Sequence, residues 1–540
     1  MNDKLKKLLS VCFWVLLWIY YSSYAVIVYW DSAHYYSYIP IIEGKVSIQE
    51  WDIVRGPVFP YLLYFIKKIF GSNNFSLVIV TFISYAIMII FVKLILDKLA
   101  DSISDKKAKF LFYCVTMLLI VINPILFGYY HALLTEFVAL TLTIASCYIA
   151  WKWIYFDCSK NILKAIGYTL FFVIGVLFSW FLKQPYVAVT LFPMLIAIVI
   201  SVFVNFNVIN LIYQIATIIL CVFTLSTSIG AWNSYLDKSG LDLNTNRNVV
   251  SNFGSQLAGS SKNVVRYSEE QQEKFEKSYL TNSKLSKEEK EIVTKKLDGE
   301  TNYLVFKVYN PKGKIDDIVV FDIENKTSIS ITQGLSILLN LFKSYPIDVS
   351  EGYITQYLFL SDVYEMTDDL DAWPLGIKKT INLDANYENL TIGSNIINPK
   401  SSILPMTDEL YNGVKDLEVY YNPPIIFQSV LDRDKNFFHR MYSITMLLLP
   451  FLFVASLVLR IVNRKKLKEF EKREYDLLIM LLGFSIMNAC VYVFTGSCID
   501  RYQSPALIPM TLSYMIYIKK IGFFVKNKIK KDDYESVETI

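Results

Sequence analysis

Charged residues are scarce in this sequence. Only 19% of the 540 residues are Asp, Glu, Lys or Arg, whereas a soluble domain carries about 25%. Hydrophobic residues make up 54% of the chain and aromatic residues 15%. Apolar runs of about 20 residues, long enough to cross the hydrocarbon core of a bilayer, recur along it. The composition excludes an ordinary soluble protein and indicates a polytopic membrane protein.

Paired cysteines and repeats are also lacking. The seven cysteines form no CxxC pair, and most lie in apolar runs, where cysteine behaves as a small hydrophobic residue rather than as a metal or redox ligand. No internal repeat is visible, and the chain lacks the matching halves with charges at the midplane that are typical of many transporters.

About ten stretches are predicted to span the membrane. They cover residues 9–30, 75–96, 109–130, 132–151, 163–182, 185–205, 208–231, 441–463, 474–496 and 502–519. The first is interpreted as a retained anchor, because it is longer than a signal-peptide core and has no small-residue cleavage site. We therefore expect a mostly α fold, a polytopic helix bundle with an α+β extracytoplasmic domain inserted between the seventh and eighth spans.

The distribution of Lys and Arg predicts the orientation. These residues gather in alternate short loops, which are the N-terminus and the loops at 98–109, 152–164, 464–473 and 519–531. The positive-inside rule then places both termini in the cytoplasm, and the loop at 31–74 and the domain at 233–437 outside. The expected parts are a transmembrane module at 1–232, the outer domain, C-terminal transmembrane helices at 438–523 and a basic cytoplasmic tail at 524–540. One kinked helix around Gln184-Pro185, instead of two helices, would invert everything downstream.

Shorter elements are expected outside the spans. Residues 57–70 are apolar on one face but too short to cross, so we expect a helix along the membrane surface with Lys67 and Lys68 on its polar side. In the outer domain, 303–308 and 318–321 are typical of strands. Residues 285–297 and 332–342 are typical of helices.

Ionisable and aromatic side chains gather at the predicted outer ends of the spans. Charges at membrane depth are costly and usually face a polar cavity or a partner. Arg55, Lys183 and Arg501 would hold a phosphate, and Asp31 or Glu136 would take a proton from an attacking hydroxyl. Fixed cations would stabilise the charge that builds on a departing phosphate. The remaining candidates, expected to contact the substrate, are His34, Tyr35, Tyr36, His131 and Tyr502.

These residues resemble the motifs of GT-C-type integral-membrane glycosyltransferases, the group of the protein O-mannosyltransferases and the bacterial aminoarabinose transferases. The similar elements are Asp31 after the first span, His34-Tyr35-Tyr36, Arg55-Gly56-Pro57-Val58-Phe59-Pro60, Phe70-Gly71, Leu133-Leu134-Thr135-Glu136, and Arg501-Tyr502 with Pro505. The resemblance covers the membrane parts of the chain.

The resemblance implies inverting transfer of a sugar from a polyprenyl-phosphate donor at the outer membrane face, with Asp31 as the general base. Many members have Asp-Glu where this chain has Asp31-Ser32, so a second carboxylate would come from elsewhere, and Glu136 is the candidate. The implied partners are the lipid-linked donor, the bilayer and a glycan, lipid or protein acceptor, with no nucleic acid. No cofactor is required, although a divalent metal held by Asp31, His34, His131 and Glu136 stays open.

Two other functions stay open. An O-antigen-type polysaccharide polymerase or ligase would also use arginines in outer loops. A non-enzymatic flippase or transporter of lipid-linked glycans would share the membrane architecture.

Overall fold

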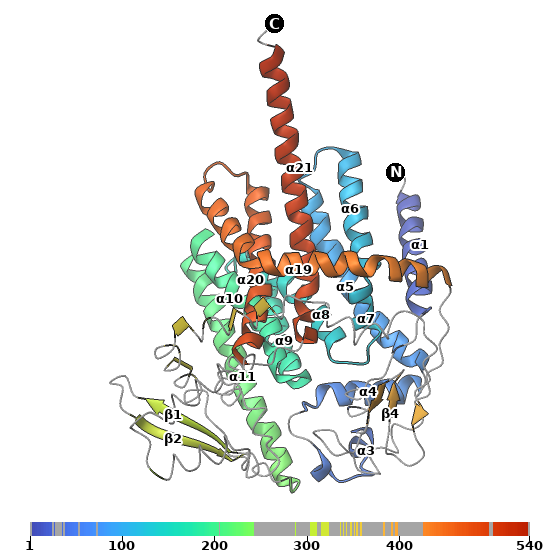
Figure 1. The fold of residues 1–540 in the computed structure, drawn as a ribbon, viewed down its shortest axis with the longest axis vertical. Coiled ribbons are helices and arrows are strands. Elements are labelled where there is room, and N and C mark those ends of the chain that lie inside the picture. The colour runs from blue at the N-terminus through green and yellow to red at the C-terminus, as the bar shows by residue number, and fades with distance from the viewer. Residues whose placement is uncertain are drawn as a thin grey trace.

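The description of the fold covers the well-placed parts of the chain. A computed structural model describes residues 3–23, 26, 35, 38–51, 55–71, 74–204, 206–241, 287, 303–309, 315–322, 335, 338–339, 342, 346–347, 350, 353–354, 357–358, 382–383, 390–392, 395–397, 425–495 and 500–537. Helices dominate these parts, and most of them run side by side as a bundle (Figure 1).

The first half of the chain is helical throughout its described residues. Its elements are α1 (Asp3–Ser22), α3 (Ile39–Ile42), η1 (Ile48–Glu50), α4 (Val58–Phe70), α5 (Asn74–Ala100), α6 (Lys106–Val121), α7 (Pro124–Tyr130), α8 (Glu136–Ile154), α9 (Ile162–Leu182), η2 (Gln184–Tyr186), α10 (Val187–Val204) and α11 (Val208–Lys238). The C-terminal part contains α19 (Ile425–Val462), α20 (Glu469–Thr495), η5 (Asp500–Ala506) and α21 (Leu507–Val537).

Strands occur only between α11 and α19 in the described residues. The antiparallel pair β1 (Tyr303–Tyr309) and β2 (Ile315–Asp322) coincides with the two predicted strands. A second sheet joins β3 (Asn382–Leu383), β4 (Leu390–Ile392) and β5 (Asn395–Ile397). The helix predicted at 285–297 lies outside the described residues except for Lys287, and of the one at 332–342 only isolated positions are described. An α+β domain over 233–437 as a whole stays a prediction.

Seven described helices are long and apolar enough to cross a membrane, or up to eight if a bent pair counts as one span. This is the architecture of a helical membrane protein. The count of about ten spans stays a prediction. Helix α1 covers the predicted span at 9–30 up to Ser22, and most residues from 24 to 30 lie outside the described residues. In the predicted span at 502–519, residues up to Ala506 belong to the separate turn η5 and the rest to α21.

The predicted span at 109–130 is broken in the middle. Helices α6 and α7 meet at an angle of 52°. The cause is the Asn123-Pro124 pair, since the Asn123 carboxamide oxygen accepts hydrogen bonds from the backbone N–H groups of Ile125 and Leu126 and thereby caps α7. Proline suits the first turn of the new helix, where its missing N–H costs nothing.

Helices α9 and α10 are two antiparallel helices rather than one kinked helix. A Cβ atom added at Gly175 in α9 would lie 3.1 Å from the Thr190 methyl carbon in α10. In one continuous helix, these two residues would be about 22 Å apart at a rise of 1.5 Å per residue. The chain therefore reverses at Lys183-Gln184-Pro185, as the orientation argument requires.

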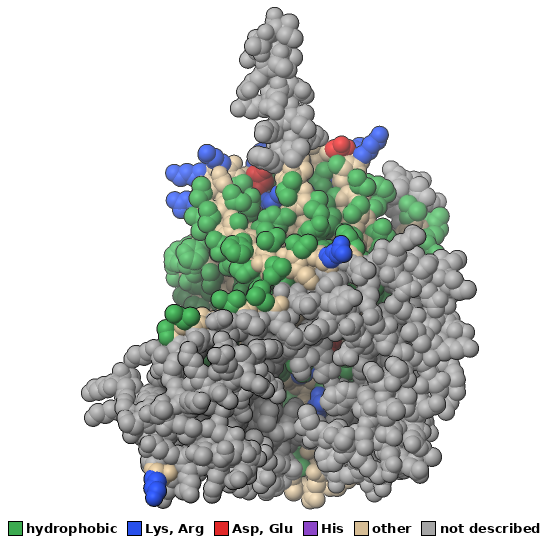
Figure 2. Space-filling view, in the orientation of Figure 1, with side chains coloured by type: hydrophobic (Ala, Val, Ile, Leu, Met, Phe, Trp, Pro, Cys, Tyr) green, Lys and Arg blue, Asp and Glu red, His purple; other side chains and the backbone are tan. Residues whose placement is uncertain are grey.

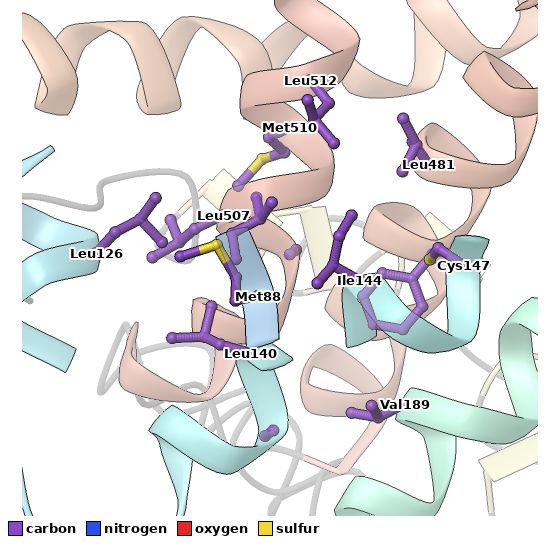
Figure 3. Close-up of a cluster of buried hydrophobic side chains, with 14 of the residues drawn as sticks. Met88, Leu126, Leu140, Ile144, Cys147, Val189, Leu481, Leu507, Met510 and Leu512 are labelled. Atoms are coloured by element: carbon purple, nitrogen blue, oxygen red, sulfur yellow. The ribbon is translucent and has the colours of Figure 1, made fainter. Parts of the chain in front are cut away.

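The main core lies where α5, α7, α8, α10, α20 and α21 meet. Figure 3 shows its side chains converging from these helices. Met88, Leu126, Leu140, Cys147, Val189, Leu481, Leu507, Met510 and Leu512 are all buried there. Helix α11 differs, because most of its apolar side chains are exposed on the outside of the bundle, as expected for a helix facing lipid.

Basic side chains gather at one end of the bundle. In Figure 1 both termini lie at this end, and in Figure 2 Lys and Arg border a belt of exposed hydrophobic side chains there. Exposed lysines such as Lys106, Lys160 and Lys466 lie in or beside its loops. Helices α3 and α4 lie at the opposite end (Figure 1).

Helix α4 matches the predicted surface helix, with one correction. Phe59, Leu63 and Ile66 are buried against the bundle, and Gly71, with a φ of 86°, ends the helix. The face away from the core is not purely polar, because Phe65 and Ile69 are 52% and 68% exposed. Such an outer face suits contact with the membrane surface.

Candidate functional site

A buried ion pair joins two of the predicted outer helix ends. Glu136 is the first residue of α8, and its side chain is 1% exposed. The Lys183 ammonium lies 3.7 Å from a Glu136 carboxylate oxygen, and the Thr135 hydroxyl donates a hydrogen bond of 3.3 Å to the other. A carboxylate in the first turn is also favoured by the helix dipole. Glu136 and Lys183, which were predicted at the outer ends of different spans, are thus direct neighbours.

Lys183 owes its position to the end of α9. Pro185 has no N–H, so it offers no hydrogen bond to the Phe181 carbonyl and α9 ends at Leu182. Lys183 is extended, with φ −163° and ψ 125°. Its backbone is still tied to both sides, since its N–H donates to Ser179 and its carbonyl accepts from Tyr186.

The late segment η5 supplies the aromatic wall of the site. The Lys183 ammonium lies 4.1 Å from the centre of the Tyr502 ring and 5.5 Å from that of Tyr186. Tyr502 in turn stacks on Tyr492 of α20, with ring centres 5.1 Å apart. A cation over a tyrosine face is stabilised by the ring quadrupole. Lys183 is therefore held by one carboxylate and by aromatic faces.

Tyr502 is itself held by polar groups inside α20. The Asn488 carboxamide donates hydrogen bonds to the Tyr502 carbonyl at 3.2 Å and to the Gln503 side chain at 2.7 Å. The Gln503 carboxamide donates to the Ser485 carbonyl. Buried polar groups that satisfy one another in this way rigidify the backbone around them.

The segment of Arg55 reaches the same region through its neighbour Gly56. A Cβ atom added at Gly56 would lie 1.9 Å from the Phe181 carbonyl oxygen, so only glycine fits against this end of α9. Arg55 directly precedes Gly56, and Lys183 follows Phe181 by two residues. The contact of Gly56 with Phe181 therefore brings the segments of Arg55 and Lys183 together. The Arg55 guanidinium donates a hydrogen bond of 3.0 Å to the Tyr35 hydroxyl.

Aromatic packing fixes Tyr35 and the Arg55 backbone. The Tyr35 ring is 2% exposed and meets Phe59 edge-on. The Trp51 indole N–H donates to the Arg55 carbonyl at 3.0 Å. Tyr35 thus holds the Arg55 side chain in place, and the predicted contact of Tyr35 with the substrate stays a prediction.

His131 lies in a buried aromatic cluster. Its ring is 1% exposed and lies between Tyr21 and Phe127, with both ring centres 4.1 Å away. One ring nitrogen lies 2.9 Å from the Phe127 carbonyl and the other 3.0 Å from the Tyr21 carbonyl, and the nitrogen that carries the proton donates to its carbonyl. His131 thus packs α1 against α7, and its contact with the substrate stays a prediction.

The remaining predicted residues are not described in full. Asp31, His34 and Tyr36 lie outside the described residues. Arg501 belongs to η5 directly before Tyr502, but only its backbone is described. In the described part of the chain, no three His, Cys, Asp or Glu side chains gather as a metal site would require.

Sequence reasoning missed several neighbours of Lys183. Tyr186 lies beside its ammonium, Tyr492 stacks on Tyr502, and Asn488 positions Tyr502. A signal existed for Asn488, since a carboxamide inside an apolar span usually serves a polar partner. The tyrosines gave no such signal in a chain with 38 of them.

A second buried charged cluster lies near the start of α20. Asp476 accepts hydrogen bonds from Arg460 of α19 and from the Tyr155 hydroxyl after α8. Lys519 of α21 donates to Glu474 and to the Leu99 carbonyl of α5. About 16 residues of α20, or roughly 24 Å, separate Asp476 from Tyr492. This cluster ties helices together at the basic end, far from Lys183.

The site therefore combines an ammonium held by a carboxylate, aromatic faces and a nearby arginine segment. A cation that is fixed in a partly buried site is suited to binding an anion such as a phosphate. Comparison of the chain with known protein families, curated proteins and solved structures finds no match.

Proposed function

We propose that the chain is a GT-C-type membrane glycosyltransferase. It would move a sugar from a polyprenyl-phosphate donor to a cell-envelope acceptor at the outer membrane face, with inversion. The observation that carries this proposal is the contact of Lys183 with both Glu136 and Tyr502. It brings two segments on which the motif resemblance rests, those of Glu136 and Tyr502, to the predicted phosphate ligand Lys183. The closeness of Gly56 to Phe181 adds the arginine segment as a third.

In this proposal Lys183, Arg55 and Arg501 hold the donor phosphate. Charge would build on that phosphate as the bond to the sugar breaks, and fixed cations would stabilise it. Tyr502 would offer its ring and its hydroxyl to the sugar. Asp31 would take the proton of the acceptor hydroxyl as it attacks the anomeric carbon.

The contacts of Glu136 favour a positioning role over a catalytic one. Its carboxylate is buried and faces the Lys183 ammonium. Charged side chains buried in a protein are usually paired, and the pair fixes their orientation. Glu136 would therefore aim Lys183 at the phosphate, leaving Asp31 as the base.

Binding of the lipid phosphate tests the site without knowledge of the sugar or the acceptor. The probe is undecaprenyl phosphate, titrated into the purified protein in nanodiscs. Lys183→Met should weaken binding by about 10- to 100-fold, because a hydrogen bond to a charged group contributes about 1.5–3 kcal/mol. Lys466→Met, an exposed lysine at the basic end, is the control and should bind as the wild type does.

Transfer is then measured by mass spectrometry of cell-surface glycans with and without the gene. Loss of single-sugar additions supports a transferase, and Asp31→Asn should reproduce that loss while the lipid phosphate still binds. Loss of whole oligosaccharide units would instead indicate a polymerase or ligase. Tight lipid-phosphate binding with unchanged glycan structures would indicate a flippase and overturn the proposal.

A further inference from the structure

Helical residues between 335 and 358 pack against the bundle next to the end of α20. The Tyr353 ring stacks on Phe342 at 5.4 Å and meets the Phe494 ring at 5.0 Å. Leu338 and Tyr353 are both buried in the main core. Phe494 is the last residue of the apolar span Glu469–Phe494. These residues of the stretch at 233–437 thus pack where a span ends.

Tyr357 binds the backbone of a spanning helix. Inside α19, the Met446 carbonyl would normally accept a hydrogen bond from the residue four positions later. That residue is Pro450, which has no N–H. The Tyr357 hydroxyl donates to the Met446 carbonyl at 2.6 Å instead. Met446 lies within the apolar span Arg440–Val462.

The same segment is also apolar on its outer side. Its exposed large side chains, 43% to 78% accessible, are Leu335, Leu339, Ile347, Ile354 and Leu358. Exposed aliphatic side chains continue on α19 around Met446, at Ile444, Leu447 and Leu448. Apolar surface that extends an apolar spanning face indicates contact with the membrane rather than with water.

We propose that the described residues between 335 and 358 lie in the outer interface of the bilayer and that their exposed side chains contact lipid chains. Part of the stretch at 233–437, expected in water from its sequence, would then be membrane-associated. The proposal rests on the packing and exposure of these residues and on the predicted orientation, and it is independent of the proposed transferase activity.

Spin labelling in liposomes tests this placement. A nitroxide is attached to p-acetylphenylalanine at Leu339 or Ile354, which leaves the native cysteines in place. Leu163, 79% exposed on α9, is the reference for lipid, and Lys45, 70% exposed near α3, is the reference for water. Labels at Leu339 and Ile354 should collide with oxygen and avoid a soluble nickel chelate, as the label at Leu163 does. Nickel accessibility equal to that at Lys45 would overturn the proposal.

A second measurement tests how the segment is anchored. Tyr357→Phe removes the donor to the Met446 carbonyl but keeps the ring. The label at Ile354 should then become more mobile, whereas the label at Leu163 should not change. Unchanged mobility at Ile354 would show that this hydrogen bond does not hold the segment to α19.

Discussion

Replacing Lys183 by methionine should destabilise the protein by leaving the Glu136 carboxylate buried without its cation. At 3.7 Å, two unit charges attract by about 4 kcal/mol in an effective dielectric constant of about 20. Removing one partner of a buried pair costs about 3–5 kcal/mol. Because the Lys183 side chain is 17% exposed, we expect the lower end, about 3 kcal/mol. The measurement is the midpoint of SDS-induced unfolding in mixed micelles, with Lys466→Met, an exposed lysine at the basic end, as the matched control.

The double variant separates stability from binding. Glu136→Gln combined with Lys183→Met removes both charges, and replacing a whole buried pair is often neutral. It should recover most of the lost stability but not the binding of undecaprenyl phosphate. If Lys183→Met unfolds at the wild-type midpoint, the ion pair does not stabilise the protein and the expected loss of about 3 kcal/mol is wrong.

Three further changes address the close approach, the orientation and the basic end. Gly56→Ala should weaken lipid-phosphate binding, since a Cβ atom would lie 1.9 Å from the Phe181 carbonyl oxygen and displace the arginine segment. With the native cysteines removed, Lys45→Cys should react with a membrane-impermeant thiol reagent in intact cells, and Lys466→Cys only after lysis. Asp476→Asn should cost about 3–5 kcal/mol of stability, measured by SDS unfolding, without changing lipid-phosphate affinity of the folded fraction.

Each of these has a clear contradicting result. Gly230→Ala, where an added Cβ meets nothing within 4 Å, is the control for Gly56→Ala. Equal binding by the two alanine variants would show that the close approach of Gly56 to Phe181 does not position the arginine segment. Labelling of Lys466→Cys in intact cells would show that the predicted orientation is wrong. Weakened binding by folded Asp476→Asn protein would show that the buried cluster at the basic end influences the phosphate site.

Much of the helical architecture follows from the sequence, because apolar runs and prolines act locally. The hairpin at Gln184-Pro185 and the surface helix α4 are examples, and both match the structure. The sequence also predicts that Glu136 and Lys183 lie at the same end of the bundle. Their direct contact depends on how α8 packs against α9, and this packing cannot be predicted from a single sequence.

Two predicted substrate residues have partners within the protein that their sequence does not reveal. His131 lies at the end of α7, and Tyr35 lies between α1 and α3. The structure gives their burial and partners, since the His131 ring nitrogens face two carbonyl oxygens and the Tyr35 hydroxyl accepts a hydrogen bond from Arg55. A polar aromatic residue near a span end is therefore weak evidence for a substrate contact unless its neighbours are known.

Three polar contacts of this bundle lie at prolines. An unbroken apolar helix satisfies its own backbone and needs no polar partner, but a proline leaves a carbonyl open or ends the helix. Pro124 is accompanied by the Asn123 cap, and Pro450 by the Tyr357 hydroxyl on Met446. Pro185 ends α9 and leaves Lys183 extended between two spans, where its ammonium meets Glu136 and Tyr502. Without that break, Lys183 would continue α9 as one more helical residue, so the candidate site depends on Pro185 as much as on the charges themselves.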